Sequence, residues 1–367
     1  MVKKSNLLLC FFCCLLLFLS AELALRTYYT LTLKENFFST PENQLDKLRT
    51  KKILPFRIFG TNHYDDAPFP TVIKDRYHRS FLYNKPTNTF RIVCLGGSTT
   101  ENKNNYEQSS IHYPLILEHL LQAKYPNKNI EVINAGFAAY SSAHLLTLLA
   151  FDVVYWQADM AIISENINDL TTAYWPNYRT DYSNKYGSKF YAAPDYQELF
   201  SPLNVLFQYS RFYWFLKKRL PLSMPEKLSI ASSSQTYSEA PLAIGQRTFT
   251  NNLQTLVHIS QDAGIKVLFA SQPISSQEDR FYVAQNAKPY HDTILYPPYP
   301  MFLKHHEFYN HILEQVAAKN KTYYLDQALL FSNHENYFAD VVHYTDEGVH
   351  ALANNYANYI IASKIIE

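Results

Sequence analysis

From residue 89 onward, short apolar runs rich in β-branched residues alternate with longer segments whose apolar residues recur at helical spacing. The strand-like runs are "TFRIVCL" (89–95), "NIEVINAG" (129–136), "DMAIIS" (159–164), "IKVLFA" (265–270) and "TYYLDQ" (322–327). The helical segments cover 113–126, 141–156, 246–264, 302–320 and the end of the chain. Strands that alternate with helices of about ten or more residues predict βαβ units and therefore a parallel sheet.

Two stretches break this alternation. Residues 171–243 are crowded with Tyr, Trp and Phe, and residues 274–300 include "YPPYP". Residues 28–88 are polar and aromatic and show no clear period. We therefore predict a membrane anchor at 1–27, a juxtamembrane lead-in at 28–88, and one α/β domain at 89–367 with insertions at 171–243 and 274–300.

An apolar run near the N-terminus predicts attachment to a membrane. Lys3 and Lys4 precede apolar residues 7–19, and further apolar residues surround Glu22. The stretch approaches the ~20 residues that span a bilayer, and Arg26 lies one helical turn after Glu22, where it can pair with the carboxylate. Small residues are poorly placed for signal cleavage, so an uncleaved signal anchor is favoured over a cleaved signal. The N-terminal lysines predict a cytoplasmic N-terminus with the rest of the chain outside.

Charge and composition exclude some classes of function. The 367-residue chain has a net charge of +1 and no basic block, which argues against nucleic acid as a partner. Three of the four cysteines lie in the first apolar run, and no metal-binding spacing occurs. Neither a disulfide framework nor a metal site is therefore expected.

Glycine is scarce, with 8 residues in the chain, so a glycine pair directly before Ser98 marks a turn that requires it. Gly97 would let the backbone turn sharply and expose the serine. Ligands of open parallel sheets bind at the carboxyl ends of the strands. Four turns are expected to meet at that edge, and they contain Ser98, Gly136, Asn168 with Asp169, and "DVVH" (340–343).

These turns supply the parts of a serine hydrolase. His343 is a base that could take the proton of the Ser98 hydroxyl. Asp340, three positions earlier, could accept a hydrogen bond from the other imidazole nitrogen and hold its tautomer. The N–H groups of Ser98 and Gly136 and the side-chain amide of Asn168 are donors of the kind that an oxyanion needs.

The blocks "LGGSTT", "VINAG", "NIND" and "DVVH", in this order, resemble those of the SGNH (GDSL-like) hydrolase superfamily. The "LGGSTT" form behind an N-terminal anchor resembles its membrane-attached bacterial branch. The resemblance covers residues 89–170 and 325–365. It implies a three-layer αβα fold with a flavodoxin-like parallel sheet of about five strands. It also implies roles for individual residues: Ser98 as nucleophile, Asp340 and His343 as its partners, Gly136 and Asn168 as oxyanion donors with Ser98, and Gly97 and Asp169 in support.

The resemblance implies that no cofactor is needed. Asn166 stands where the third block of the superfamily usually opens with glycine. Asp326 also follows a strand but lacks the three-residue relation to a histidine, and His350 on the last helix is expected to be structural. Segment 204–220 is open to three interpretations: a buried helix with a basic end, a segment at the membrane surface, or a roof over the substrate cleft. Tyrosines of 174–196 could stack on sugar rings.

The function expected from the sequence is that of a membrane-anchored serine esterase on the outer side of a bacterial cytoplasmic membrane. Its expected substrate is an envelope or extracellular glycan that carries acetyl or other short acyl groups. Three alternatives stay open: an O-acyltransferase on a glycan, a lipid esterase, and a catalytically silent envelope scaffold. Sequence does not separate hydrolysis from transfer, because the same acyl-enzyme serves both reactions.

Overall fold

The computed structural model describes residues 4–33, 37, 60–61, 63–64, 69–102, 111–187, 210–212, 240–281, 294 and 296–366. The chain divides into two compact units. One consists of Met1–Lys52 with Ala192–Glu226, and the other of Ile53–Tyr191 with Lys227–Glu367. The residues of the candidate site all belong to the second, larger unit.

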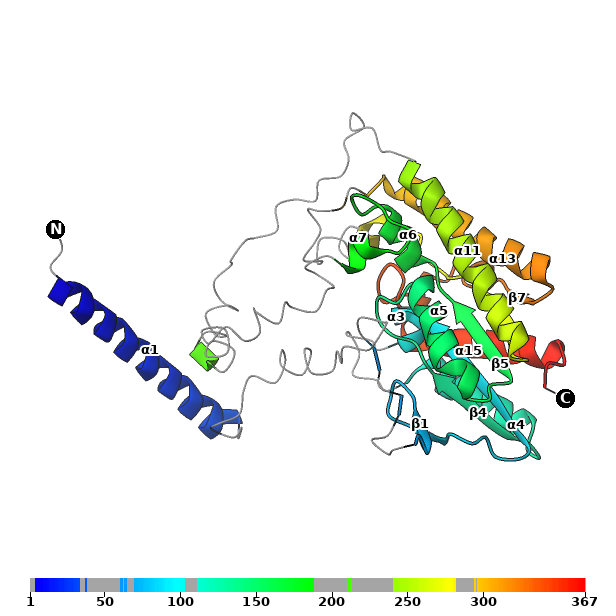
Figure 1. Ribbon diagram of the computed structural model, residues 1–367, viewed down its shortest axis with the longest axis horizontal. Coiled ribbons are helices and arrows are strands. Elements are labelled where there is room, and N and C mark those ends of the chain that lie inside the picture. Colours follow the sequence, from blue (N-terminus) through cyan, green and yellow to red (C-terminus); the bar gives the residue numbers. More distant parts are fainter. Residues whose placement is uncertain are drawn as a thin grey trace. The chain divides into compact units, whose positions relative to one another are not determined.

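The larger unit is built on one parallel sheet with the strand order β4-β3-β5-β6-β7 (Figure 1). The strands are β3 (Thr89–Gly96), β4 (Asn129–Asn134), β5 (Met160–Ser164), β6 (Lys266–Ala270) and β7 (Tyr323–Leu325). The first of them, β3, pairs with β4 on one side and with β5 on the other. This is the flavodoxin-like order, so the predicted α/β class and the five parallel strands are confirmed.

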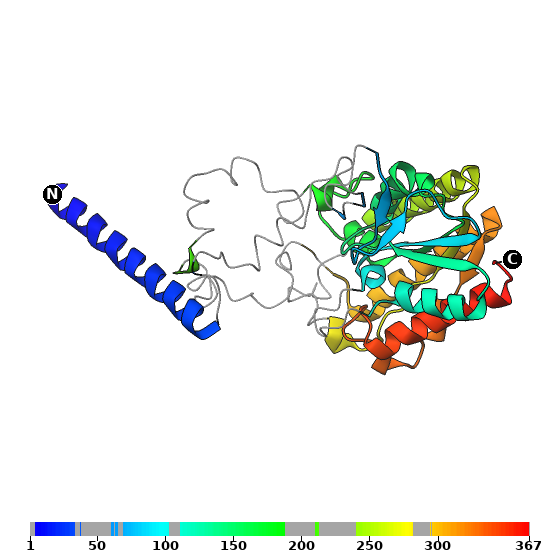
Figure 2. The same cartoon turned by 90° about the horizontal axis from the view of Figure 1, so that it is seen from below.

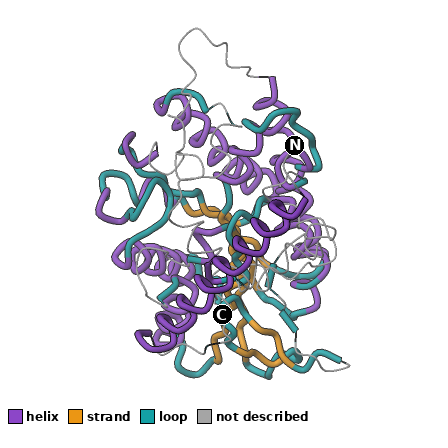
Figure 3. The backbone as a smooth tube through the Cα atoms, turned by 90° about the vertical axis from the view of Figure 1, so that its left-hand side faces the viewer, coloured by secondary structure: helices purple, strands orange, loops and turns teal. Residues whose placement is uncertain are grey.

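Helices cover both faces of the sheet and complete the three layers (Figure 3). On one face lie α5 (Ser142–Phe151), α11 (Ala240–Asp262) and α13 (Tyr299–Asn320). On the other lie α4 (Tyr113–Lys124) and α15 (Asp346–Ala362), which pack side by side (Figure 2). The segments that follow the strands place the polar turns at the carboxyl edge of the sheet.

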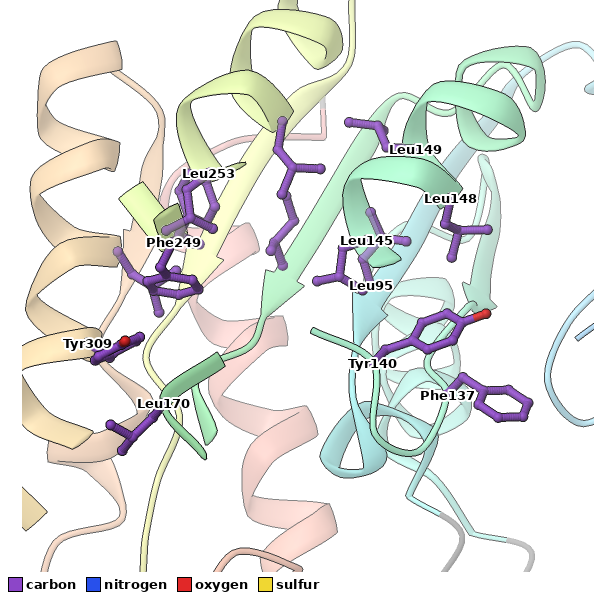
Figure 4. Packing of buried hydrophobic residues seen from close by; sticks show 14 of the residues in the cluster. Leu95, Phe137, Tyr140, Leu145, Leu148, Leu149, Leu170, Phe249, Leu253 and Tyr309 are labelled. Carbon is purple, nitrogen blue, oxygen red and sulfur yellow. The ribbon is translucent and has the colours of Figure 1, made fainter. Parts of the chain in front are cut away.

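The strands contribute alternate residues to the two cores, because successive side chains of a strand point to opposite faces. In β3, Val93 and Leu95 belong to the core with α5 and α11, whereas Ile92 and Cys94 belong to the core with α4 and α15. Figure 4 shows the first core, in which Leu145 of α5 lies next to Leu95. Burial on both faces fixes β3, and with it the position of the turn that follows.

Several short elements complete the larger unit. They are β1 (Val72–Lys74), β2 (Ser80–Leu82), α3 (Ser98–Glu101), η1 (Val153–Tyr155), α6 (Ile167–Ala173), α7 (Ser183–Tyr186), α14 (Gln327–Leu330) and η3 (Glu335–Tyr337). β1 and β2 form an antiparallel hairpin within the segment interpreted as a lead-in. Arg79, next to this hairpin, donates to the carbonyl of Val132 in β4 and forms an ion pair with Glu118 of α4. This part of the lead-in therefore packs onto the α/β domain.

The smaller unit contains α1 (Lys4–Leu33). Within α1, Arg26 Nε lies 2.7 Å from Glu22 Oε1, which confirms the pair predicted one helical turn apart. The carboxylate of Glu22 also accepts hydrogen bonds from Ser210 Oγ and from the N–H groups of Arg211 and Phe212. The rest of segment 204–220 lies outside the described residues, so its three interpretations stay predictions. Within the part of the chain that the structure describes, no helix combines the length and the apolarity that a membrane crossing requires.

Candidate active site

Ser98 is the first residue of α3 and lies directly beyond the central strand β3. Its side chain is half-buried, and its Oγ lies 2.8 Å from Nε2 of His343, a residue 245 positions later in the chain. The N–H of Ser98 donates to no acceptor among the described residues. A partly accessible hydroxyl with a base in contact and a backbone donor beside it is an arrangement suited to nucleophilic attack.

His343 and Asp340 lie in one loop, and two backbone contacts close this loop. Phe338 and Tyr344 form an antiparallel bridge at its base, and the N–H of Ala339 donates to the carbonyl of His343. His343 Nδ1 lies 2.7 Å from Asp340 Oδ2. Because an ionised carboxylate only accepts, Nδ1 carries the proton, and Nε2 is left as the acceptor that faces Ser98.

The carboxyl of Asp340 is held in its charged form. Burial favours the neutral form, but hydrogen bonds from the His343 ring and from the N–H groups of His343 and Val342 outweigh it. Together with electrostatic attraction to the His343 ring, they lower the pKa of Asp340 to about 2. The ionised carboxylate therefore stabilises the imidazolium that forms when His343 takes a proton.

Asn168, in the first turn of α6, lies against the turn that carries the serine. Its Nδ2 donates to the carbonyl of Tyr140 at 2.9 Å. A methyl group added to Gly97 would lie only 2.5 Å from this Nδ2, so the amide is in contact with the backbone directly before Ser98. The structure thus brings together Ser98, His343, Asp340 and Asn168 as the sequence predicted.

The position of Asn166 explains how the third block works without its usual glycine. The residue has φ −158° and ψ −61°, which lies outside the left-handed region that favours glycine. Its Nδ2 donates to the carbonyl of His306 and to Oδ1 of Asn310, both at 2.8 Å. The asparagine therefore ties the turn before Asn168 to α13.

Gly136 differs from its expected role. Its N–H already donates to Oδ1 of Asn134 at 3.0 Å, and this bond is buried. A methyl group at Gly136 would lie 2.4 Å from the N–H nitrogen of Glu101 in α3. The glycine is needed because α3 packs closely against it, so the donor role assigned to its N–H is not what the structure shows.

The residue that sequence reasoning missed in this turn is Ala139. It adopts φ 66°, which is uncommon for a residue other than glycine and often marks a functional turn. Its N–H has no acceptor among the described residues, and the following carbonyl, that of Tyr140, borders Gly97. The preceding N–H, that of Ala138, donates to Glu101 Oε2 at 2.6 Å and fixes the turn to α3. Ala139 is thus the backbone donor of this turn that is left for an oxyanion.

Two buried carboxyl groups lie beneath Asn168. Glu165 Oε1 accepts from the N–H of Asn168 at 3.0 Å, and Oε2 lies 3.4 Å from its Nδ2. Burial, and then the neighbouring Asp169, raise the pKa of Glu165 to about 8. Asp169 accepts from the N–H and the hydroxyl of Ser142 and from the hydroxyl of Tyr182, and these donors stabilise its charged form.

Helix α7, at the start of the aromatic insertion, contacts the turn that contains Ala139 and the turn that contains Asn168. Tyr186 Oη donates to the carbonyl of Ala139 at 2.7 Å, and Lys185 Nζ donates to the carbonyl of Asn168 at 3.1 Å. Tyr182 and Tyr186 are both buried. These two tyrosines therefore do not present their rings to a sugar, contrary to the use considered for the tyrosines of 174–196.

Asp326 and His350 lie away from the contact between His343 and Ser98. Asp326 caps α14 and accepts from the hydroxyl of Ser271 at 2.7 Å, so it serves the fold at that position. His350 is exposed on α15. Neither is the partner that the structure gives to His343.

Comparison with known proteins agrees with this geometry. The model of the GDSL-like lipase/acylhydrolase family matches residues 94–351, which is more than half of the chain. The match confirms the resemblance of the chain to that superfamily. No curated protein matches the chain.

Among solved structures, an acetylxylan esterase from Geobacillus stearothermophilus is 15% identical and is matched over 74% of this chain and 94% of its own, with a TM-score of 0.42. A lipase/acylhydrolase from Enterococcus faecalis is 15% identical over 75% of this chain and 96% of its own, also with a TM-score of 0.42. An α/β hydrolase from the metagenome of Lake Arreo is 13% identical over 76% and 96%, with a TM-score of 0.41. Similarities of this size carry no argument about the activity of this chain.

Proposed function

Since the chain belongs to the GDSL-like lipase/acylhydrolase family and is a carboxylic ester hydrolase, we propose that it cleaves its ester through an acyl intermediate on Ser98. The observation that carries this proposal is the pair of contacts at His343, 2.8 Å to Ser98 Oγ and 2.7 Å to Asp340 Oδ2. A serine hydroxyl is a weak nucleophile unless an adjacent base takes its proton.

In the first half-reaction, Ser98 Oγ forms a bond to the carbonyl carbon while His343 Nε2 takes the hydroxyl proton. The carbonyl oxygen becomes an oxyanion, and the N–H groups of Ser98 and Ala139 and the amide of Asn168 are the donors that stabilise it. Collapse of this intermediate breaks the bond to the alcohol oxygen, which leaves with the proton from His343. Water then attacks the acyl-serine with the same base and releases the carboxylic acid and Ser98.

The proposed substrate is an acylated glycan outside a bacterial cytoplasmic membrane, with acetyl as the first acyl group to test. Partial exposure of the catalytic side chains supports access by a large polymer. Ser98 is only partly buried, and the side chain of His343 is 35% exposed. The blocks "LGGSTT" and "VINAG" follow an apolar N-terminal run, as in the membrane-attached branch that they resemble. This resemblance further supports the proposed glycan substrate and the proposed N-terminal anchor. Fractionation of cells followed by a carbonate wash tests the anchor, which predicts that the full-length protein stays with the membranes.

The acyl-serine proposal is tested by labelling with a fluorophosphonate probe, which reacts with an activated serine. We expect the wild type to be labelled and Ser98→Ala to be unlabelled and inactive. A panel of esters with acyl chains of increasing length then separates a preference for short acyl groups from lipid esterase activity. Product analysis with and without a glycan acceptor separates hydrolysis from transfer. Absence of labelling in the wild type would refute the acyl-serine and favour the scaffold.

A further inference from the structure

The buried carboxyl of Glu165 lies next to the amide that is to stabilise the oxyanion. We propose that Glu165 is a positioning residue that must be uncharged for Asn168 to donate to the oxyanion, so that its ionisation lowers the esterase activity at alkaline pH. This inference rests on the proposed function. It concerns a residue next to the strand end that none of the four blocks contains.

The two hydrogen atoms of the Asn168 side-chain amide have different partners. Nδ2 carries two of them, and one is donated to the carbonyl of Tyr140 at 2.9 Å. The second faces Glu165 Oε2 at 3.4 Å, which is a long and weak contact. That second hydrogen is the one left for an oxyanion on the acyl group of Ser98. Its use therefore depends on how strongly Glu165 holds it.

The protonation state of Glu165 sets that strength. A charged carboxylate accepts hydrogen bonds about twice as strongly as a neutral acceptor. It would hold the second N–H of Asn168, and its negative charge would oppose the developing charge of the oxyanion. A neutral carboxyl still accepts from the backbone N–H of Asn168 at 3.0 Å, which keeps the turn in place. The neutral form thus positions Asn168 without competing for its amide.

The surroundings of Glu165 favour the neutral form. Glu165 is fully buried, and among the described residues only Asn168 donates to it. The charged groups nearby are Asp169, whose negative charge raises the pKa of Glu165, and Lys185, whose positive charge lowers it by less. Burial raises the pKa of Asp169 as well, but its carboxylate receives three donors, so Asp169 holds the negative charge and Glu165 holds the proton.

Two tyrosines also interact electrostatically with this carboxyl. Burial raises the pKa of Tyr186 and of Tyr344 well above 10, so both stay neutral over the range of interest. Burial and Asp169 raise the pKa of Glu165 to about 8, which places its ionisation where activity can be measured.

The test is the pH dependence of kcat and kcat/KM for the full-length protein with p-nitrophenyl acetate, from about pH 6 to about pH 10. Spontaneous hydrolysis is subtracted, and product is read at the isosbestic wavelength. We expect wild-type kcat to fall by about tenfold per pH unit above the ionisation of Glu165 while KM changes little. Glu165→Gln keeps an acceptor for the backbone N–H but cannot ionise, so its profile should stay flat there.

The matched control is Glu118→Gln. Glu118 is also a largely buried carboxyl whose pKa is raised by burial, but it lies on α4 and pairs with Arg79. Its replacement should leave the alkaline fall unchanged. The positioning role is refuted if Glu165→Gln keeps the wild-type fall, or if the wild type shows no fall up to about pH 10. Because the second outcome needs only the wild type, the proposal stays testable even if Glu165→Gln fails to fold.

Labelling separates this inference from the function on which it rests. If Ser98→Ala is inactive and wild-type Ser98 is labelled by the fluorophosphonate, but Glu165→Gln keeps the alkaline fall, then the positioning role alone is wrong. If Ser98→Ala retains esterase activity, the acyl-serine is wrong and the inference falls with it.

Discussion

The contact between Gly97 and Asn168 gives the sharpest test of how the oxyanion site is assembled. In Gly97→Ala, the new methyl group would lie 2.5 Å from Asn168 Nδ2, 2.7 Å from Glu165 Oε2 and 3.3 Å from the carbonyl oxygen of Tyr140. Non-bonded heavy atoms pack at about 3.5 Å, so the methyl overlaps the amide by about 1 Å. The amide is held from the other side by Tyr140, and Glu165 is buried, so Asn168 has to leave its position.

The size of the effect follows from that displacement. A misplacement of about 1 Å in an active site can cost about 10²-fold in rate. Complete loss of one oxyanion donor costs about 10²- to 10³-fold in kcat, which is about 2.7–4 kcal/mol. We therefore expect kcat of Gly97→Ala to fall by about 10²-fold or more, with KM changed much less. Overpacking of this kind also lowers the free energy of unfolding, by about 1–3 kcal/mol.

The assay is steady-state hydrolysis of p-nitrophenyl acetate by Gly97→Ala, Asn168→Ala and the double variant, with Tm recorded for each. If the methyl acts through Asn168, the double variant should be no slower than Asn168→Ala alone, because the two changes remove the same donor. Gly97→Ala with wild-type kcat would refute the reasoning. Independent losses that multiply in the double variant would show that the methyl disturbs something other than the amide.

Four further predictions follow from the same contacts. Asp340→Asn should lower kcat by up to about 10⁴-fold in ester hydrolysis, because an amide no longer holds the tautomer and charge of His343; activity close to wild type would contradict this. Ala139→Gly keeps the N–H and relieves the left-handed conformation, so kcat should stay within about twofold while the free energy of unfolding rises by up to about 1 kcal/mol in urea titrations. Arg91→Met should cost about 3–5 kcal/mol by the same titration, because it leaves the largely buried Glu131, now paired at 2.7 Å, without its partner. For Glu165, the unfolded chain loses its proton at about pH 4.3 whereas the folded protein keeps it until about pH 8, so stability falls with rising pH between these values. The Tm of Glu165→Gln should therefore exceed that of the wild type by more at pH 8 than at pH 5, and a constant difference would contradict it.

The parts of the site that sequence predicts are those fixed by local spacing or by the topology of the sheet. Asp340 and His343 are three residues apart, and a short turn brings their side chains into contact. Ser98 and His343 are 245 residues apart, yet both lie at the carboxyl edge of one parallel sheet, which the alternation of strands and helices already indicates. The five strands are likewise predicted by local features, because each run is short and apolar and the runs are rich in β-branched residues.

Other parts of the site depend on side-chain packing that no local pattern contains. A glycine at position 136 indicates a special turn, but it does not reveal whether the glycine serves a hydrogen bond or a close approach. Here the close approach of Glu101 requires it. At position 139 the residue with positive φ is an alanine, so the usual signal of that conformation is missing. The pKa of Glu165 depends on neighbours such as Lys185, which comes from an insertion without regular periodicity.

The start of the insertion is therefore part of the machinery that holds the oxyanion donors. Within four residues, α7 contacts both donor turns, through Tyr186 to the carbonyl of Ala139 and through Lys185 to the carbonyl of Asn168. Since each bond is made to the carbonyl of a donor residue, it fixes the orientation of the backbone without consuming the N–H or amide that faces the substrate. The nucleophile and its base come from the sheet edge, whereas the orientation of the oxyanion donors depends on α7. A change in the insertion that displaced α7 would thus act on transition-state stabilisation and leave the contact between Ser98 and His343 intact.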